Sequence, residues 1–113
     1  MSLRFKLVFF SPATNTRSIL DHLFLKFPTQ LGKIGNYDQV AFLSRGTGQF
    51  KPCEGAKPVT GSVGALEFVE EDRVEIVVHD LGQREQVRAI IHELKTVHPY
   101  EEVAYDVYKV EDL

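Results

Sequence analysis

The segment from residue 98 to 102 holds the densest group of chemically active side chains in the sequence. It places an imidazole, a phenol and two carboxylates close together, as His98, Tyr100, Glu101 and Glu102. His98 with Glu101 and Glu102 could bind a divalent metal ion, since imidazole and carboxylate suit zinc or manganese. The same groups could transfer protons or contact a ligand. The structural alternative is that Pro99 ends a helix, the Tyr100 ring packs and the carboxylates meet solvent.

A second candidate is the glycine-rich segment from Gly46 through Gly48 to Phe50. It lacks the terminal Lys-Ser/Thr of a P-loop, and it does not open a helix as a dinucleotide-binding fingerprint does. We expect a tight turn that the glycines permit and that folds Phe50 back onto the core. The alternative is an anion site, for which Arg45, Lys51 and Lys57 would supply the positive charge.

The cysteine, the other histidines and the acidic residues do not indicate a catalytic or metal-binding site. Cys53 is the single cysteine, so it forms no internal disulfide and fits a reducing compartment. His22, His79 and His92 show no pair at the helical spacing of a two-histidine metal motif. We therefore predict no catalytic residue, no cofactor and no metal site, with His98, Glu101 and Glu102 as the fallback ligands. The acidic run is expected to be a solvated strand edge: Glu67, Glu70, Glu71, Asp72 and Glu75.

Composition limits the class of protein. With 113 residues, 43% hydrophobic and 26% charged, the chain is expected to form one globular domain over residues 1–113. Its net charge of -3 argues against a nucleic-acid partner. We see no apolar run long enough to cross a membrane and no secretory signal, and we predict a cytoplasmic protein.

The first half of the chain reads as strand, helix and strand. Residues 3–10 alternate with period two and predict a strand with one buried face. Ser11 and Pro12 suit the cap and the first position of a helix, which Pro28 should end. Residues 38–45 predict a second strand with Val40 and Phe42 turned inward, followed by a loop over residues 46–64. The apolar stripe expected on the helix is Ile19, Leu20, Leu23, Phe24 and Phe27.

The second half repeats that order. Residues 73–79 predict a third strand, with Val74, Ile76 and Val78 on the core side. Asp80 and Gln83 stand at capping-box spacing before a second helix, which Pro99 stops. Residues 103–110 predict the last strand. The apolar stripe expected on this helix is Val87, Ile90, Ile91 and Leu94.

The order β-α-β-β-α-β predicts an α+β fold, a ferredoxin-like sandwich in which a four-stranded antiparallel sheet carries both helices on one face. The other face should then be bare, and it is too apolar for a wet surface. We predict that it is a subunit interface, with scattered surface apolarity as the alternative. Its residues are expected to be Arg4, Lys6, Val8, Phe10, Ala41, Leu43, Val77, Ala104, Tyr108 and Val110.

Three segments, residues 33–52, 54–75 and 98–112, together resemble a known family. They carry the patterns G-x-I-G-x-Y, G-x-G-x-F-x-P and H-P-Y-E-E. They are similar to the central inserted domain of the YqfO/Nif-three-like family, also called dinuclear-metal proteins or GTP cyclohydrolase I type 2 homologues. That insert is similar to the trimeric CutA and PII signalling proteins, and this chain looks like a stand-alone form of it.

The resemblance implies a CutA/PII-like fold and a trimer, with a dimer as the alternative. Family members carry a two-metal site on flanking lobes, so none of those ligands transfers to this chain. In PII proteins the loop between the second and third strands is regulatory, and anionic ligands bind at its base between subunits. In CutA-type proteins, a turn similar to residues 98–102 serves architecture and subunit contact.

From the residues and the resemblance together, we expect a non-enzymatic, oligomeric binding or regulatory module with a small anionic ligand at subunit clefts. The alternatives are a metal-binding or hydrolytic protein and a purely structural interaction subunit. The predicted ligand-binding residues are Arg45, Gly46, Gly48, Lys51, Lys57, His98, Tyr100 and Glu101.

Overall fold

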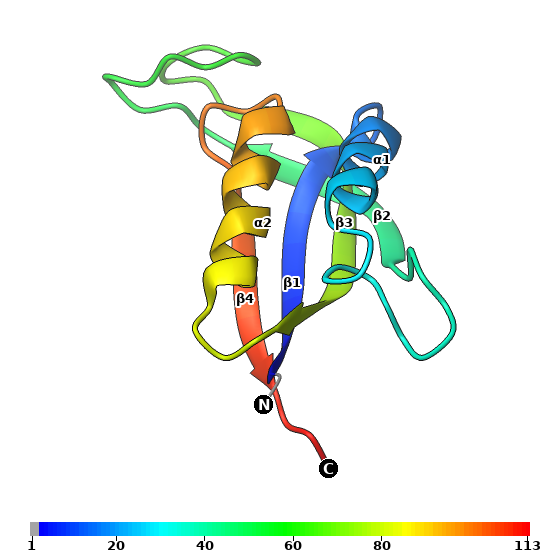
Figure 1. The fold of residues 1–113 in the computed structure, drawn as a ribbon. Helices are drawn as coiled ribbons and strands as arrows, with labels where there is room; N and C mark the ends of the chain where they lie inside the picture. The colour runs from blue at the N-terminus through cyan, green and yellow to red at the C-terminus, as the bar shows by residue number, and fades with distance from the viewer. Residues whose placement is uncertain (1–2) are drawn as a thin grey trace.

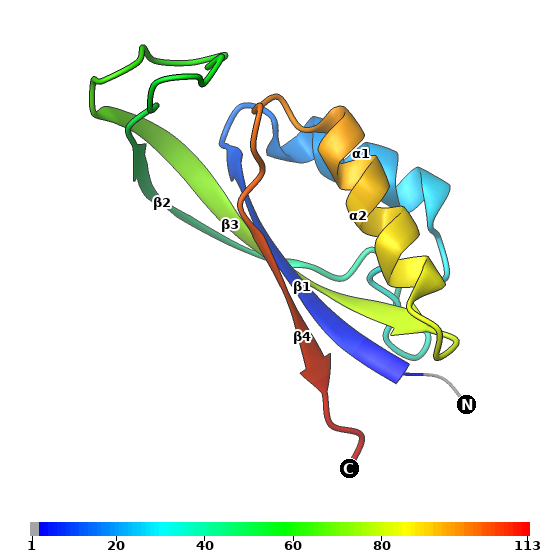
Figure 2. The ribbon, with the colours of Figure 1, turned by 90° about the vertical axis from the view of Figure 1, so that its left-hand side faces the viewer.

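The computed structural model describes residues 3–113 and shows one four-stranded antiparallel sheet with two helices on one of its faces (Figures 1 and 2). The strands lie in the order β2-β3-β1-β4. This is the predicted ferredoxin-like sandwich. The elements in chain order are β1 (Leu3–Pro12), α1 (Thr16–Lys26), β2 (Phe42–Phe50), β3 (Glu67–Asp80), α2 (Glu85–Val97) and β4 (Tyr105–Val110).

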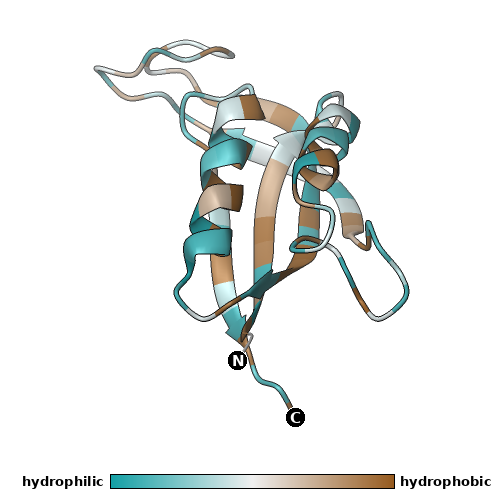
Figure 3. Cartoon of the chain, in the orientation of Figure 1, coloured by the Kyte–Doolittle hydropathy of each residue, from teal (hydrophilic) through white to brown (hydrophobic). Residues whose placement is uncertain are grey.

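The core lies between the sheet and the helices, where Figure 3 shows hydrophobic stretches on the central strands and on the helices that cover them. Both apolar helix stripes and the inward residues of β3 are confirmed, although Phe27 and Ile91 pack only at the margin of the core. The core residues are Phe5, Leu7, Phe9, Ile19, Leu20, Leu23, Phe24, Leu31, Val74, Ile76, Val78, Val87, Ile90 and Leu94. No helix within residues 3–113 is both long and apolar enough to span a membrane.

The first helix starts later than predicted. Ser11 and Pro12 still belong to β1, opposite Asp72 and Glu71 of β3, and α1 begins at Thr16. The Ser11 hydroxyl is buried and lies 2.7 Å from the Thr16 hydroxyl. Ser11 therefore contributes to a buried polar contact with the helix rather than to a cap, because pairing with β3 holds it in extended backbone.

The entry into α2 depends on Asp80, as predicted, but with a different partner. The buried Asp80 carboxylate accepts backbone N–H groups from Gly82, Arg84 and Val87 at 2.8–3.1 Å. Burial alone would raise the pKa of Asp80, but these N–H groups outweigh it and hold that pKa below its usual value. The reciprocal bond comes from Gln86, whose Oε1 accepts the Leu81 N–H, and not from Gln83.

The second strand is the main correction to the predicted fold. β2 runs from Phe42 to Phe50, so the glycine-rich segment is strand and not a tight turn. Phe42 is paired opposite Glu75 and is 64% exposed, whereas the next residue, Leu43, stands opposite Val74 on the helix-covered face. The predicted inward and outward residues of this strand are thus exchanged, which is what a one-residue shift does in a strand. The remaining loop is residues 51–66.

The β2–β3 pair extends past the rest of the sheet and forms an arm, which we define as residues 46–50, loop 51–66 and residues 67–71. β1 ends at Pro12, opposite Glu71, so the part of the pair beyond that point has no further strand beside it. Figure 2 shows the arm curving away from the helices. At the other edge β4 begins at Tyr105, slightly later than predicted.

The sheet face opposite the helices, called the open face here, is partly apolar as predicted. Val8 and Val77 are buried within the chain, Phe10 and Val110 are half-buried, and Tyr108 is 54% exposed. The register adds Phe42 to this face and removes Leu43 from it.

Candidate ligand-binding site

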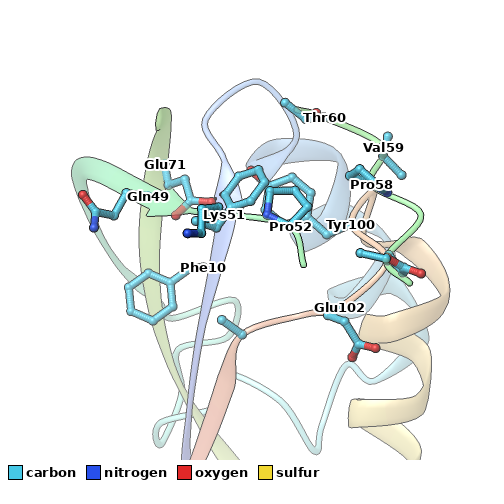
Figure 4. A pocket seen from close by; sticks show the side chains of 15 residues that line it. Phe10, Gln49, Lys51, Pro52, Pro58, Val59, Thr60, Glu71, Tyr100 and Glu102 are labelled. Carbon is cyan, nitrogen blue, oxygen red and sulfur yellow. Dashed lines mark hydrogen bonds between the residues drawn. The ribbon is translucent and has the colours of Figure 1, made fainter. Parts of the chain in front are cut away.

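A cavity of about 460 Å³ opens on the open face at the base of the arm (Figure 4). Three parts of the chain surround it: the end of β2 and β3, the loop 51–66, and the turn 98–102. Its lining residues are Phe10, Gly48, Gln49, Phe50, Lys51, Pro52, Ala56, Pro58, Val59, Thr60, Glu71, Tyr100, Glu101, Glu102 and Ala104. Such a volume is in the range of small-molecule sites.

Gly48 shapes the strand side of the cavity. A Cβ on Gly48 would lie 2.0 Å from Oε1 of Glu71, so a larger residue would force that carboxylate to leave its place over the strand. Glu71 comes from β3, where its register partners are Pro12 on β1 and Gly46 on β2. The glycine in mid-strand therefore serves the close approach of a neighbouring group rather than a turn.

The turn 98–102 is anchored by His98, which is buried at 6% exposure. Its Nε2–H donates to the Phe10 carbonyl oxygen at 2.7 Å, and its Nδ1 accepts the Tyr100 N–H at 3.1 Å. Because a carbonyl only accepts and a backbone N–H only donates, these bonds specify the neutral Nε2–H tautomer. Burial lowers the pKa of His98, against the opposing effects of the Phe10 carbonyl and Glu71.

Tyr100 joins the turn to the arm. Its hydroxyl donates to Oε2 of Glu71 at 3.0 Å, and its ring centroid lies 6.0 Å from that of Phe50. Burial, assisted by the Glu71 carboxylate, strongly raises the pKa of Tyr100, so the phenol stays protonated and remains a donor. This contact spans β3, β2 and the turn, and it holds one wall of the cavity.

The loop 51–66 is held by one hydrogen bond to the turn and by one across the loop itself. The backbone N–H of Lys57 donates to Oε1 of Glu101 at 2.9 Å, and the N–H of Gly64 donates to the carbonyl of Pro52 near the other end of the loop at 2.8 Å. Pro52 itself is buried. The loop therefore has a defined path over the cavity, which the density of glycine and proline did not suggest.

Four of the eight predicted ligand-binding residues line the cavity: Gly48, Lys51, Tyr100 and Glu101. Gly46 borders a smaller adjoining hollow, which shares Phe10, Gly48 and Glu71 with the cavity. Lys57 contributes a backbone N–H to Glu101, and His98 supports the turn from beneath.

Arg45 has a structural role in this arrangement. Its Nε–H donates to the buried Asp72 at 2.7 Å, and its Nη1 donates to Glu70 at 2.6 Å. Asp72 also accepts the Thr16 hydroxyl at 2.7 Å. Arg45 first and Thr16 second hold the pKa of Asp72 below its usual value. This network joins β2 and β3 to the start of α1, and it engages the guanidinium of Arg45, a residue that also borders the smaller adjoining hollow.

Several lining residues were not among those predicted for ligand binding, chiefly Phe10, Phe50, Glu71 and Ala104. Glu71 was assigned to a solvated acidic edge, and Phe10 to the subunit interface. The alternation of β1 carried a usable signal, since it already places Phe10 on the face opposite the helices. The contribution of Glu71 depends on the register of β3 against β2, which the sequence pattern does not supply.

The fallback metal set does not come together. Both ring nitrogens of His98 are engaged in hydrogen bonds to the chain. Within residues 3–113, no three His, Cys, Asp or Glu side chains converge in a way that could hold a metal ion.

No protein-family model matches the sequence. The chain is 47% identical over 104 residues to a GTP cyclohydrolase 1 type 2 homolog of Halalkalibacterium halodurans, a match that covers 92% of this chain and 26% of the relative. Its fold matches the crystal structure of a Bacillus cereus protein related to NIF3 with a TM-score of 0.76, and the two sequences are 37% identical. This match covers 99% of this chain and 27% of the Bacillus cereus chain.

The chain thus spans about a quarter of the length of these two relatives. A smaller protein, CutA1 from Pyrococcus horikoshii, shares the fold at 14% identity, with a TM-score of 0.60 and coverage of 96% of this chain and 85% of its own. The chain is therefore homologous to one segment of the NIF3/YqfO family of GTP cyclohydrolase 1 type 2 homologs, and its fold is that of CutA.

Proposed function

We propose that the chain is a non-enzymatic binding or regulatory module that self-associates through the open face and holds a small ligand in the cavity at the base of the arm. The observation that carries this proposal is the cavity itself, whose walls come from three separate parts of the chain. The Tyr100–Glu71 and Lys57–Glu101 hydrogen bonds join these parts. A ligand that touches all three would stabilise their arrangement, which is what a regulatory response requires.

Self-association is supported by the one-sided placement of the helices. Phe42 and Tyr108 expose more than half of their surface on the open face, with Phe10 and Val110 beside them. A second copy of the chain that covers this face would remove apolar surface from water at about 25 cal/mol per Å². The likeness to CutA favours three subunits, with two as the alternative.

The cavity opens on this same face, since Phe10, Gly48 and Glu71 all point to it by register. A ligand there would lie beside the proposed subunit contact. On this proposal, the cleft expected between subunits would include the cavity. The exposed, free Cys53 fits a reducing compartment, and a cytoplasmic location is part of the proposal.

The assembly is tested by light scattering at micromolar concentration. We expect a mass near three chains for the wild type and a smaller species for Tyr108→Asp. Tyr37→Asp is the matched control, because Tyr37 is 75% exposed in the segment between α1 and β2. A monomeric wild type, or an equal effect of both changes, contradicts the interface.

Ligand binding is tested by a thermal-shift screen of small metabolites against the wild type and Ala104→Trp, which fills the cavity. Ala89→Trp is the control, since Ala89 is an exposed residue of α2 outside the cavity lining. Ligands that stabilise the wild type and Ala89→Trp but not Ala104→Trp support the proposal. A screen in which no compound stabilises the wild type contradicts it.

A further inference from the structure

The walls of the cavity are mainly aromatic and aliphatic. Phe10, Phe50 and Tyr100 contribute rings, and Pro52, Pro58 and Val59 cover the sides between them. Figure 4 shows Phe10 on one side of the space, with Tyr100 and Pro52 along a second side and Pro58 and Val59 beyond them. Ring faces carry partial negative charge, so they attract cations as well as apolar groups.

The charged groups in the lining are mostly acidic. Glu71, Glu101 and Glu102 stand against a single cation, Lys51. Glu71 accepts the Tyr100 hydroxyl and Glu101 accepts the Lys57 N–H, but both donors are neutral and leave the carboxylate charge in place. Figure 4 shows Glu71 and Glu102 on different sides of the space. A ligand inside would meet negative charge from more than one direction.

The donors that the sequence offered for an anion are mostly engaged or lie outside the lining. The Arg45 guanidinium is bound to Asp72 and Glu70. Lys57 is not a lining residue and gives its backbone N–H to Glu101, and the Tyr100 hydroxyl is bound to Glu71. Lys51 is the charged donor that the lining retains. Anions in proteins are held by convergent N–H groups or paired cations, and this lining does not supply them.

We infer that the cavity selects a small organic cation, such as an aromatic or alkyl ammonium group, rather than the anion expected from the sequence. The inference rests on the proposed binding function and specifies its ligand class. The apolar part of the ligand would lie against Phe10, Phe50 and Tyr100. Its positive charge would face Glu102 and Glu71. The ring faces and the carboxylates would then both attract the cation.

The test uses three probes that share a phenyl ring and differ in charge: benzyltrimethylammonium, benzyl alcohol and phenylphosphonate. Each is titrated into the isotope-labelled full chain, and the NMR shifts of amides in residues 48–60 and 100–104 give its dissociation constant. We expect benzyltrimethylammonium to bind at least about fivefold more tightly than benzyl alcohol, the range of a cation–π contact with an added carboxylate. Phenylphosphonate should bind more weakly than either.

Variants separate the contributions of charge and ring. Glu102→Gln should weaken the cation about two- to fivefold and leave benzyl alcohol unchanged. Glu85→Gln is the matched control, because Glu85 is an exposed carboxylate in the first turn of α2 and is absent from the lining. Phe50→Leu should weaken binding of benzyltrimethylammonium more than binding of benzyl alcohol. Lys51→Gln should strengthen binding of benzyltrimethylammonium.

Three outcomes overturn the inference. Tighter binding of phenylphosphonate, lost in Lys51→Gln, would make the cavity an anion site. Equal binding of the cation and the alcohol would show that charge is not recognised. Both outcomes leave the proposed binding function intact. If no probe binds, the cation inference fails, and the metabolite screen with Ala104→Trp then decides the binding function separately. Dissociation of the assembly by Ala104→Trp, with no probe bound, would instead assign the cavity to a second copy of the chain.

Discussion

Acidification is expected to destabilise this protein through His98. The imidazole is buried, and both of its nitrogens are used, one as donor to the Phe10 carbonyl and one as acceptor of the Tyr100 N–H. A second proton would take the place of that acceptor bond and add a charge to a buried position. For this reason the folded protein lowers the pKa of His98 below its ordinary value, with burial as the largest cause.

The sign and size of the effect follow from linkage. An unfolded histidine has a pKa of about 6.5, and the folded value is lower, so between the two the unfolded state binds more protons. The free energy of unfolding contributed by His98 is therefore constant above about pH 7 and decreases below about pH 6.5. One proton limits the slope to about 1.4 kcal/mol per pH unit, and the total between pH 7.5 and 5.5 to about 1.4 kcal/mol.

The assay is urea unfolding at pH 7.5, 6.5 and 5.5, at one fixed protein concentration because assembly shifts apparent stability. His98→Gln keeps a polar group but cannot titrate, so its stability should fall less with pH than that of the wild type. At pH 7.5 the same change should itself cost about 1–3 kcal/mol, since the Tyr100 N–H loses its acceptor. His92→Gln, an exposed position on α2, should follow the wild type at every pH. Equal pH dependence in the wild type and His98→Gln would refute this reasoning.

Two further changes test the contacts that hold the elements together. Asp80→Ala should lower the free energy of unfolding by about 2–4 kcal/mol, because three N–H groups at the start of α2 lose their acceptor. Urea denaturation measures this loss. A loss below about 1 kcal/mol would contradict the role of Asp80 as the cap of α2. Arg45→Ala should lower the thermal midpoint more than Arg73→Ala does. The reason is that Arg45 neutralises the buried Asp72, whereas Arg73 lies 3.8 Å from the half-buried Glu75. Equal midpoints of the two variants would argue against a stabilising role of the Arg45–Asp72 contact.

The core could be predicted from the sequence because burial repeats with the period of each element. Val74, Ile76 and Val78 alternate along β3, and Ile90 and Leu94 recur at helical spacing on α2. In these two elements one face is buried, so the spacing of the apolar residues identifies that face without reference to the rest of the chain. The same holds for the Asp80 cap, a local contact between neighbouring residues.

The second strand could not be predicted in the same way, because it lies at an edge of the sheet. Most of its residues are exposed, including Phe42, and only pairing with β3 determines which residues face the helices. Gly46 and Gly48 predict a break in the strand, because glycine weakens an isolated strand. In the structure, fourteen residues of β3 supply a partner long enough to hold that segment extended.

The cavity was only partly foreseeable, for a related reason. The polar turn stood out by composition, but the carbonyl that fixes His98 belongs to Phe10, 88 positions earlier in the chain. The link between the turn and the glycine-rich segment came from the family resemblance rather than from any pattern in the residues. Contacts between distant segments depend on strand register, which local periodicity does not specify.

Gly48 belongs both to the edge strand β2 and to the lining of the cavity. A side chain there would favour the strand locally, yet it would displace Glu71, and Glu71 is the acceptor that holds Tyr100 in the cavity wall. The chain thus departs from strand preference at the position where the departure leaves space for the Glu71 carboxylate beside the proposed binding site. It follows that pairing of the arm and closure of the cavity are coupled. A ligand that bridges the turn and β2 should protect the amides of residues 46–50 from hydrogen exchange, even where it does not touch them.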